Sequence, residues 1–410
     1  MNTPPLRVLV GVTGGVAAYK SAELVRRLRD RGCDVIVAPT QSALNFVGEA
    51  TWAALSGHAI VRSLWERAEQ VPHVSIARSV DVCVIAPATA DFLARLAAGR
   101  GDDVLTAIAM MTRSPIVIAP AMHTEMWQSP STVANVEVLR SRGMLVINPA
   151  AGRLTGPDSG VGRLSAPESL ADVVVAAARQ SSSMLDLRGH HMVVSAGGTR
   201  EALDPVRWIG NRSSGRMGYA IAAAAVARGA EVTVVSANVE LPDVAGAVTV
   251  MVTNHRELRA ALVAASESAD SVVMAAAVAD FTTEPGAQKI KKTVPAAAVS
   301  FELQPTTDIL AELCANRTGP GPYIIGFAAE TVVEDGELLA LARRKLTAKG
   351  CDALFANDVS NGAVFGQEQV AGLIVTADGQ HLPVPEQTKS AAAVQVVDLV
   401  ASSRHRPSPS

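Results

Sequence analysis

The segment that decides the fold of this chain is Ser195-Ala-Gly-Gly-Thr-Arg-Glu-Ala-Leu-Asp-Pro-Val-Arg-Trp-Ile-Gly-Asn-Arg-Ser-Ser-Gly-Arg-Met-Gly218. It begins at the end of an apolar run, 192–195, that predicts a β-strand, and it precedes an alanine-rich run, 219–228, that predicts an α-helix. Between them lie four arginines, two adjacent serines and five glycines. Glycines let backbone N–H groups crowd around a ligand, and a helix N-terminus adds a positive dipole end. The segment therefore predicts an anion-binding loop suited to phosphate chemistry.

An alternation of strands and helices extends outward from this segment in both directions. Four predicted helices end in a basic residue followed by glycine, with a short apolar strand next: Arg31-Gly32 before 35–38, Arg142-Gly143 before 145–147, Arg228-Gly229 before 232–235, and Lys349-Gly350 before 353–355. The glycine supplies a left-handed cap and the cation meets the negative end of the helix dipole. Short apolar strands that alternate with helices are typical of parallel sheets covered on both faces. The sequence thus predicts an α/β protein with doubly wound, Rossmann-like, mainly parallel sheets.

The strand–helix pattern restarts after residue 190, which indicates two domains. Arg179-Gln-Ser-Ser-Ser183 interrupts the apolar periodicity and is typical of a linker. We therefore predict one domain over 1–180, a linker over 181–189 and a second domain over 190–401. The tail 402–410 has nothing to bury and is predicted to be disordered.

Composition narrows the classes of function. The chain has 410 residues, is 49% hydrophobic and carries a net charge of −3. Without a basic face, a nucleic-acid partner is not expected, and the apolar runs are too short to span a membrane. The start of the chain resembles a first strand rather than a signal peptide. The four cysteines lack paired spacing, which predicts buried thiols in a reducing cytoplasm.

Ligands of doubly wound sheets bind beyond the carboxyl ends of the strands. In the first domain a strand leads into the turn of Gly14 and Gly15, and the next strand ends in the hydroxyls of Thr40 and Ser42. The turn lacks the Gly-x-Gly-x-x-Gly spacing, and no acidic residue ends the second strand to grip a ribose diol. A mononucleotide fits better than NAD, although an ordinary strand-to-helix turn would look the same.

His73 stands in Val71-Pro-His-Val-Ser-Ile-Ala77. Taken alone, it is either a loop histidine that caps the next helix or a catalytic base.

Three motifs give the first domain a family resemblance. Val71-Pro-His-Val-Ser-Ile-Ala77, Ala86-Pro-Ala-Thr-Ala-Asp91 and Pro120-Ala-Met-His-Thr-Glu-Met-Trp127 resemble, in this order, motifs of the flavin-dependent cysteine decarboxylases. That family includes phosphopantothenoylcysteine decarboxylase. Over residues 7–400 the chain resembles the bacterial bifunctional coenzyme A biosynthesis family, in which this decarboxylase is fused to phosphopantothenate–cysteine ligase. The resemblance implies an N-terminal flavodoxin-like flavoprotein domain and a C-terminal ligase domain.

The implied cofactor of the first domain is FMN. A cysteine carboxylate cannot simply leave, because the carbanion would have no electron sink. Oxidation of the thiol carbon by flavin creates that sink, and the reduced flavin later returns the electrons. The resemblance makes His73 a base or orienting group near the thiol. The residues assigned to FMN are Gly14, Gly15, Thr40, Ser42, Pro87, Ala88 and Thr89.

Two positions depart from the family pattern. His123 stands where the family has an asparagine, and a ring N–H can bind the substrate carboxylate as an amide N–H would. The flap, 152–164, lacks the family's cysteine, which protonates the enethiolate. Thr155, Asp158, a water or a residue of another subunit could donate this proton. The flap itself is either a mobile lid or a flexible crossover.

The second domain contains the residue types that a nucleotide-dependent ligase needs. A carboxylate reacts with an amine only after its oxygen becomes a good leaving group, which requires a triphosphate cradle, a divalent metal and a cation. The cradle is the opening segment, with Gly197, Gly198, Ser213, Ser214 and Gly215. Asp280 could hold Mg²⁺ and Lys289 could reach phosphate, although a basic cluster is usually a solvated surface.

The run from Ala276 to Asp280, followed by Lys289-Ile-Lys-Lys292, resembles the nucleotide-binding run of the ligase family. The bacterial family uses CTP, which implies an acyl-cytidylate, release of pyrophosphate, attack by the cysteine amine and loss of CMP. Asn211 and Arg207 match residues tied to the intermediate; both could also serve turn chemistry. The implied CTP contacts are Asp280, Lys289, Thr307, Asp308, Ile309, Leu310, Phe327, Lys345 and Lys349.

The resemblance implies a cytoplasmic enzyme that makes 4′-phosphopantetheine from 4′-phosphopantothenate and cysteine. It also implies a homo-oligomer, a dodecamer with trimeric flavin-domain contacts and dimeric ligase-domain contacts. Two alternatives remain: a two-domain NAD(P)-dependent oxidoreductase, and a non-catalytic flavin-binding regulatory protein. His73 and Lys289 argue against the second.

Overall fold

The computed structural model describes residues 4–64, 72–154, 158–180, 185–291, 300–319, 321–330, 337–359 and 367–404. The chain divides into two compact units. One is Met1–Arg188 with Val226–Gly229 and Pro242–Gly246, and the other holds the remainder. Across the described ranges, no helix combines the length and the apolar character needed to span a membrane.

The first unit is built on a parallel sheet of five strands in the order β2-β1-β3-β4-β5. Their bounds are β1 Arg7–Val12, β2 Asp34–Pro39, β3 Val82–Ala88, β4 Ile116–Pro120 and β5 Leu145–Val146. This is the flavodoxin-like order, in which the strands are all parallel and the direction of winding along the sheet reverses between β1 and β3. The predicted fold class is confirmed, and the ligand is expected at the carboxyl ends of those two strands.

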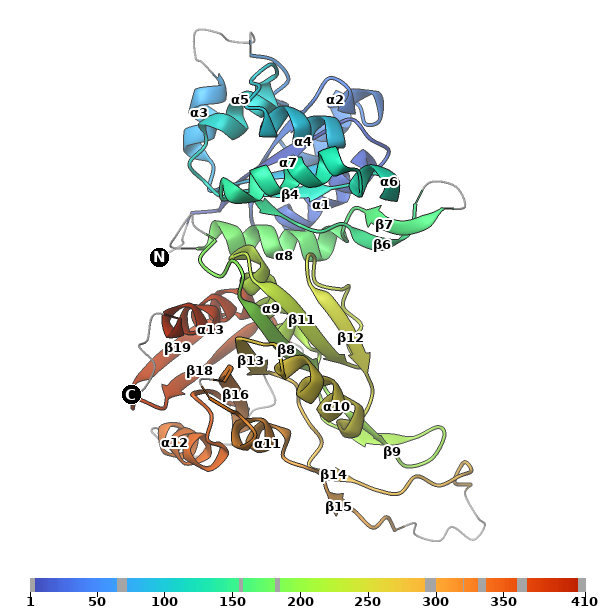
Figure 1. The fold of residues 1–410 in the computed structure, drawn as a ribbon, viewed down its shortest axis with the longest axis vertical. Helices are drawn as coiled ribbons and strands as arrows, with labels where there is room; N and C mark the ends of the chain where they lie inside the picture. Colours follow the sequence, from blue (N-terminus) through green and yellow to red (C-terminus); the bar gives the residue numbers. More distant parts are fainter. Residues whose placement is uncertain are drawn as a thin grey trace. The chain divides into compact units, whose positions relative to one another are not determined.

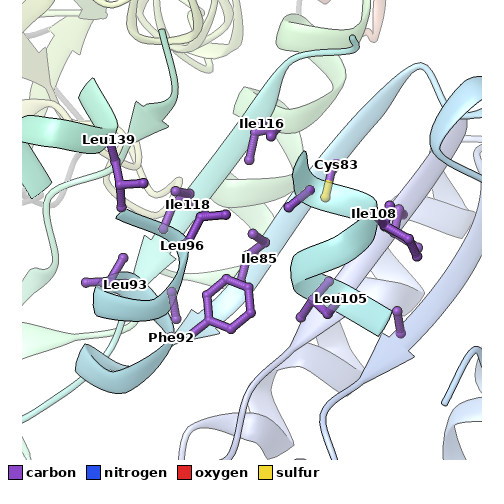
Figure 2. Packing of buried hydrophobic residues seen from close by; sticks show 14 of the residues in the cluster. Cys83, Ile85, Phe92, Leu93, Leu96, Leu105, Ile108, Ile116, Ile118 and Leu139 are labelled. Carbon is purple, nitrogen blue, oxygen red and sulfur yellow. The ribbon is translucent and has the colours of Figure 1, made fainter. Parts of the chain in front are cut away.

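Helices cover both faces of this sheet. α1 (Ala18–Asp30) and α8 (Pro167–Ala178) pack together, as do α3 (Pro72–Ser79) and α5 (Val104–Met111), and α4 (Ala90–Ala97) and α7 (Pro130–Ser141). Figure 2 shows Phe92, Leu93 and Leu96 of α4 packed over Ile85 and Ile118 of the sheet. Spacings of three and four place these side chains on one helix face, so the hydrophobic pattern fixes how α4 lies on the strands. Shorter elements are η1 (Ala43–Asn45), α2 (Glu49–Ser56), α6 (Thr124–Trp127) and the hairpin β6 (Ala150–Arg153) and β7 (Ser159–Arg163).

The second unit contains an eight-stranded sheet in the order β12-β11-β8-β13-β16-β17-β18-β19. Its first six strands are parallel and have the 3-2-1-4-5-6 order of a Rossmann sheet, while β18 and β19 add an antiparallel edge. The bounds are β8 His191–Gly197, β11 Glu231–Ala237, β12 Val248–Val252, β13 Ser271–Met274, β16 Tyr323–Glu330, β17 Ala353–Asp358, β18 Gln369–Thr376 and β19 His381–Thr388. The direction of winding along the sheet reverses between β8 and β13, so a ligand is expected there.

One face of this sheet is covered by α10 (His255–Ser266), α11 (Ile309–Ala315) and α12 (Glu337–Lys349). α9 (Arg216–Ala227) covers the other face, where Tyr219 Oη lies 3.0 Å from Ser236 Oγ of β11, and α13 (Lys389–Ser403) packs on β18 and β19. Two small ribbons, β9 (Arg200–Ala202) with β10 (Trp208–Gly210) and β14 (Phe281–Thr282) with β15 (Gln304–Pro305), project from the sheet (Figure 1).

The predicted linker and the predicted tail each contain residues that the structure describes as buried or helical. Within the predicted linker 181–189, Leu187 is fully buried. Helix α13 runs to Ser403, so it includes the first two residues of the predicted tail 402–410. The hydroxyls of Ser402 and Ser403 donate to the carbonyls of Asp398 and Val400, which lets the polar end of the helix continue without burial. Residues 405–410 lie outside the described part of the chain.

Candidate active sites

In the first unit, the turn after β1 joins the end of β3. The Thr13 hydroxyl donates to the Pro87 carbonyl over 2.7 Å and accepts from the Thr89 amide over 3.0 Å. Gly14 lies so close to Ser42 that a Cβ at Gly14 would be 2.4 Å from the Ser42 Cβ. The structure therefore brings together four of the residues predicted for FMN: Gly14, Ser42, Pro87 and Thr89.

The other predicted FMN residues complete the same edge. A Cβ at Gly15 would meet Thr89 Cγ2 at 3.6 Å, so this position leaves room. Thr40 is buried and its hydroxyl accepts from the Ala43 amide, which holds the turn that carries Ser42. Ala88 is buried in the core, which leaves its backbone as the part that could face a ligand.

His73 is the second residue of α3. Because α3 ends three residues before β3 begins and packs along the sheet, its first turn lies toward the carboxyl ends of the strands. The Nδ1 atom of His73 is buried and has no hydrogen-bond partner among the described residues. An unsatisfied buried polar atom costs about 1–3 kcal/mol, so this nitrogen fits a site that a ligand completes.

His123 begins α6 in the segment that follows β4, and the β6–β7 hairpin packs directly on this segment. The Met122 amide donates to the Gly162 carbonyl over 3.0 Å, and a Cβ at Gly162 would be 2.1 Å from the Met122 carbonyl oxygen. Of the two candidate proton donors, Asp158 is exposed and its carbonyl accepts from the Leu154 amide, whereas Thr155 lies outside the described residues. The flap therefore adjoins His123 at its described ends.

In the second unit, the opening segment folds into a tight loop between β8 and α9. Gly197 has a positive φ of 84°, and a Cβ there would be 2.0 Å from the Ala237 carbonyl oxygen. Gly198 touches Ser213, and its amide donates to the same carbonyl over 3.0 Å. All five predicted cradle residues thus meet at the carboxyl ends of β8 and β11.

A pocket of about 160 Å³ opens beside this loop. Four of its lining residues are predicted CTP contacts: Ser213, Ser214, Gly215 and Phe327. The Phe327 ring stacks on Phe355, with centroids 4.9 Å apart, so it presents a fixed aromatic wall. The pocket also takes in Ala275–Ala277 after β13, Arg216 on α9 and Lys389 on α13.

Arg207 connects the loop of residues 204–207 to the segment that carries Lys289. Its Nη1 donates to Asp204 Oδ2 and to the Ile290 carbonyl, each over 3.0 Å, and the Ile290 amide donates to the same carboxylate over 3.1 Å. Burial alone would raise the pKa of Asp204, but three backbone amides and Arg207 hold it below its usual value. Lys289 is exposed and directly precedes Ile290, whose carbonyl accepts the hydrogen bond from Arg207. Asn211 Nδ2 donates to the Val278 carbonyl over 2.8 Å, which ties it to the segment before Asp280.

The remaining predicted CTP contacts come from three segments, and hydrogen bonds and ion pairs show which of them lie side by side. The Thr306 amide donates to the Asp280 carbonyl over 2.9 Å, which brings Asp280 beside Thr307. Lys349 pairs with Asp308, and Lys345 Nζ lies 2.6 Å from Glu330 Oε1. Burial would raise the pKa of Asp308, but Lys349 and the Ala311 amide lower it. Ile309 and Leu310 are buried in the core, so only their backbone could contact a nucleotide.

Four cations near these sites are not among the individually assigned site residues, although Arg216 belongs to the predicted anion-binding segment and Arg163 to the flap. Burial and the nearby charge of Arg163, on the flap, hold the pKa of Lys20 below its usual value, so these two cations share one neighbourhood. Arg216 and Lys389 share the pocket of the second unit. In the structure Lys389 is the first residue of α13, where a cation opposes the helix dipole. Its proximity to Arg216 depends on chain positions far apart in sequence, which no local pattern encodes.

Comparison with known proteins agrees with this division of the chain. Residues 1–179 match the family described as Flavoprotein, and residues 187–403 match the family described as DNA/pantothenate metabolism flavoprotein C-terminal domain. The Coenzyme A biosynthesis bifunctional protein CoaBC of Mycobacterium bovis is 45% identical over 405 residues, 97% of both chains. The protein of that name from Vibrio cholerae is 40% identical over 398 residues, 96% of this chain and 97% of its own. A crystal structure of the C-terminal domain of a protein of this name matches 53% of this chain and 97% of that one, with 32% identity and a TM-score of 0.45.

These matches favour the predicted bifunctional enzyme over an NAD(P)-dependent oxidoreductase. The chain belongs to the family of bifunctional coenzyme A biosynthesis proteins, enzymes that combine a flavoprotein decarboxylase with a ligase.

Proposed function

We propose that the second unit joins 4′-phosphopantothenate to cysteine with CTP and Mg²⁺, and that the first unit decarboxylates the product with FMN. The ligase half of this proposal rests on one observation above all. A glycine- and serine-rich loop at the start of α9 lines the same pocket as Phe327, whose ring stacks on Phe355. Backbone amides at a helix N-terminus suit phosphate oxygens, and an aromatic wall suits a base or ribose.

The ligase residues have separate tasks in this proposal. Lys289 stabilises charge on the phosphorus under attack, and Asn211 stabilises charge that builds on the acyl oxygen. Arg207 acts with Lys289, because its contact with Ile290 holds the neighbouring backbone. The described residues contain no cluster of three or more His, Cys, Asp or Glu side chains placed to bind a metal. Mg²⁺ commonly binds through one or two carboxylates plus substrate phosphates, which makes Asp280 together with the triphosphate a sufficient set.

Isotope transfer tests the chemistry of this half. We expect one oxygen of carboxyl-¹⁸O-labelled 4′-phosphopantothenate to appear in CMP, because the acyl-cytidylate leaves its bridging oxygen on the phosphorus when cysteine attacks. Mass spectrometry of CMP and inorganic phosphate distinguishes the routes. Label in inorganic phosphate, with CDP as the nucleotide product, would contradict cytidylyl transfer.

The decarboxylase half rests on the carboxyl edge of β1 and β3. Gly14 approaches Ser42 too closely for a side chain at position 14, which leaves the backbone of this turn open to a ligand. The Nδ1 atom of His73 is buried without a hydrogen-bond partner among the described residues, which suits a group that contacts the ligand. Lys20 and Arg163 add positive charge near this edge, as a phosphate group requires. FMN, when bound, supplies a reversible two-electron acceptor. In this proposal His73 moves the proton of the substrate thiol, and His123 binds the carboxylate that leaves as carbon dioxide.

Gly14→Ala is expected to reduce FMN affinity by about 10-fold or more, since the added methyl group collides with the Ser42 backbone and Cβ and shifts the turn. The measurement is flavin fluorescence on titration of the apoprotein. Gly48→Ala is the matched control, because a Cβ at Gly48 meets nothing within 4 Å. Equal affinity for the Gly14 and Gly48 variants would remove this turn from the cofactor site.

Two variants distinguish Thr155 from Asp158 as the proton donor. Thr155→Ala is expected to be nearly silent, because a threonine hydroxyl is a poor acid at neutral pH, whereas Asp158→Asn is expected to slow turnover about 10-fold or more if the carboxyl donates. The measurement is single-turnover decarboxylation with deuterium incorporation from solvent. An inactive Thr155 variant that still binds FMN would instead assign the step to the threonine.

Assembly and location complete the proposal. Val16, Tyr19 and Phe46 are exposed beside the cofactor turn, and large exposed apolar side chains are typical of subunit contacts. They support trimeric contacts of the flavin domain; with dimeric ligase domains the assembly is a dodecamer. The four cysteines are unpaired, which supports a reducing cytoplasm. We retain the domain bounds 1–180 and 190–401.

A further inference from the structure

Lys389 is the first residue of α13, some 170 residues away in sequence from the loop that begins α9. It is half-buried and lines the same pocket as Ser213, Ser214 and Arg216. The preceding residue, Thr388, caps the helix by accepting from the Ala391 amide over 3.3 Å. The cap fixes where the helix begins, so it also fixes the position from which the Lys389 side chain enters the pocket.

Lys389 brings a positive charge to a pocket that already contains Arg216. A cation in the first turn of a helix faces the positive end of the helix dipole. Burial lowers the pKa of Lys389, and the charge of Arg216 lowers it further. Arg216 in turn is the first residue of α9, so two cations and two helix N-termini contribute to one pocket. Such a concentration of positive charge is stabilised by an anion bound between them.

The side-chain amide of Gln387 is a further hydrogen-bond donor on the same side of the sheet as the pocket. Gln387 of β19 lies opposite Val370 of β18, which lines the pocket, and directly opposed residues of an antiparallel pair face the same side. The Nε2 atom of Gln387 is buried and has no hydrogen-bond partner among the described residues.

We propose that Lys389, together with Arg216, binds a phosphate group of the ligand that occupies this pocket. This inference rests on the proposed ligase function and assigns a binding residue that the ligase motifs do not contain. Two substrates of that reaction carry phosphate: the nucleotide, through its triphosphate, and the phosphorylated acid, through its 4′-phosphate. Both ligands share a phosphate group, and its negatively charged oxygens are what the pocket residues would bind.

Isothermal titration calorimetry of the full-length protein distinguishes these sources. Lys389→Met is expected to weaken binding of one phosphorylated ligand, CTP or 4′-phosphopantothenate, by about 10- to 100-fold, the loss for one charge-assisted contact. Binding of the other ligand is expected to change less than about 3-fold. If CTP is the affected ligand, CMP and cytidine show which part of the triphosphate Lys389 contacts. A contact with the α-phosphate would weaken binding of both CTP and CMP, whereas a contact with the β- or γ-phosphate would weaken binding of CTP alone. Binding of cytidine would be unchanged in both cases. Lys389→Arg is expected to restore most of the affinity.

Two control variants make the result specific. Arg256→Met removes the same charge from a side chain that is 75% exposed on α10, and it is expected to leave both affinities unchanged. Arg216→Met is expected to reproduce the Lys389 defect, and the double variant is expected to lose less than the product of the two single losses, because both cations contact one group.

The results distinguish failure of the phosphate-binding role of Lys389 from failure of the proposed ligase function. If wild-type protein binds neither CTP nor 4′-phosphopantothenate, the proposed ligase function fails. If wild-type protein binds them but Lys389→Met retains both affinities, the function stands and the phosphate role of Lys389 is overturned. Equal weakening of phosphorylated and unphosphorylated ligands would also overturn it, since that pattern reports a general change of the pocket; circular dichroism and retained flavin content check that the variants fold.

Discussion

Lys289→Gln is expected to reduce CTP-dependent pyrophosphate release by at least about 100-fold, the scale of losing one group that stabilises developing charge. Glutamine keeps the length and polarity of the side chain but removes the positive charge, so the change isolates the electrostatic contribution. The measurement is coupled detection of pyrophosphate with 4′-phosphopantothenate, cysteine and CTP. Decarboxylation of supplied 4′-phosphopantothenoylcysteine, and the flavin spectrum, should remain at the wild-type level.

Lys291→Gln is the matched control for this prediction. Lys291 is exposed and lies two residues further along the same segment, so it carries the same charge without a proposed role. We expect this variant to retain ligase turnover. Comparable losses in both variants would indicate that the segment attracts anions as a basic surface, and near-normal turnover of Lys289→Gln would contradict the assigned role outright.

His73→Asn is expected to slow carbon dioxide release by about 10²- to 10⁴-fold, the range for loss of a positioned acid–base group. Asparagine can replace a hydrogen bond made by the ring but cannot exchange a proton near neutral pH. The buried, unpartnered Nδ1 of His73 is the observation that singles out this histidine. The measurement is single-turnover decarboxylation of 4′-phosphopantothenoylcysteine by protein that retains FMN.

His58→Asn provides the comparison within the same unit. His58 Nε2 lies 2.6 Å from Asp34 Oδ1 at the start of β2, the opposite end of the strand from the cofactor edge. That variant is expected to decarboxylate at the wild-type rate. Normal release by His73→Asn would remove the proton-transfer role, and loss of flavin in that variant would move His73 from catalysis to cofactor binding.

Local sequence patterns predicted many strands of both sheets, but not β12, β18 or β19 and not the lateral order of the strands. The helix caps at Gly32, Gly143, Gly229 and Gly350 all have positive φ values, as expected from the sequence. Continuously apolar strands indicated parallel sheets because both faces had to be covered. The orders 2-1-3-4-5 and 3-2-1-4-5-6, and the antiparallel edge of β18 and β19, depend on contacts between distant segments. No single stretch of the sequence contains that information.

The candidate sites show the same division between local and distant information. The glycine turn follows strand β1 and the serine pair precedes helix α9, so local patterns in the sequence could locate them. Phe327 lies within β16, in one of the apolar runs that predicted strands. The ion pairs of Lys345 with Glu330 and Lys349 with Asp308 could not be foreseen, since their partners come from other elements. The clustering of Arg216 with Lys389 is of the same kind, because it requires α9 and α13 to begin at one pocket.

In the proposed function, one chain activates a carboxylate by nucleotidyl transfer and then releases a different carboxylate as carbon dioxide. The most direct test is incubation of the purified, FMN-loaded protein with 4′-phosphopantothenate, cysteine, CTP and Mg²⁺, with products followed by mass spectrometry. We predict 4′-phosphopantetheine, carbon dioxide, CMP and pyrophosphate in equal amounts, with 4′-phosphopantothenoylcysteine as the transient species. Failure to form the cysteine amide, or accumulation of that amide without loss of carbon dioxide, would contradict the account.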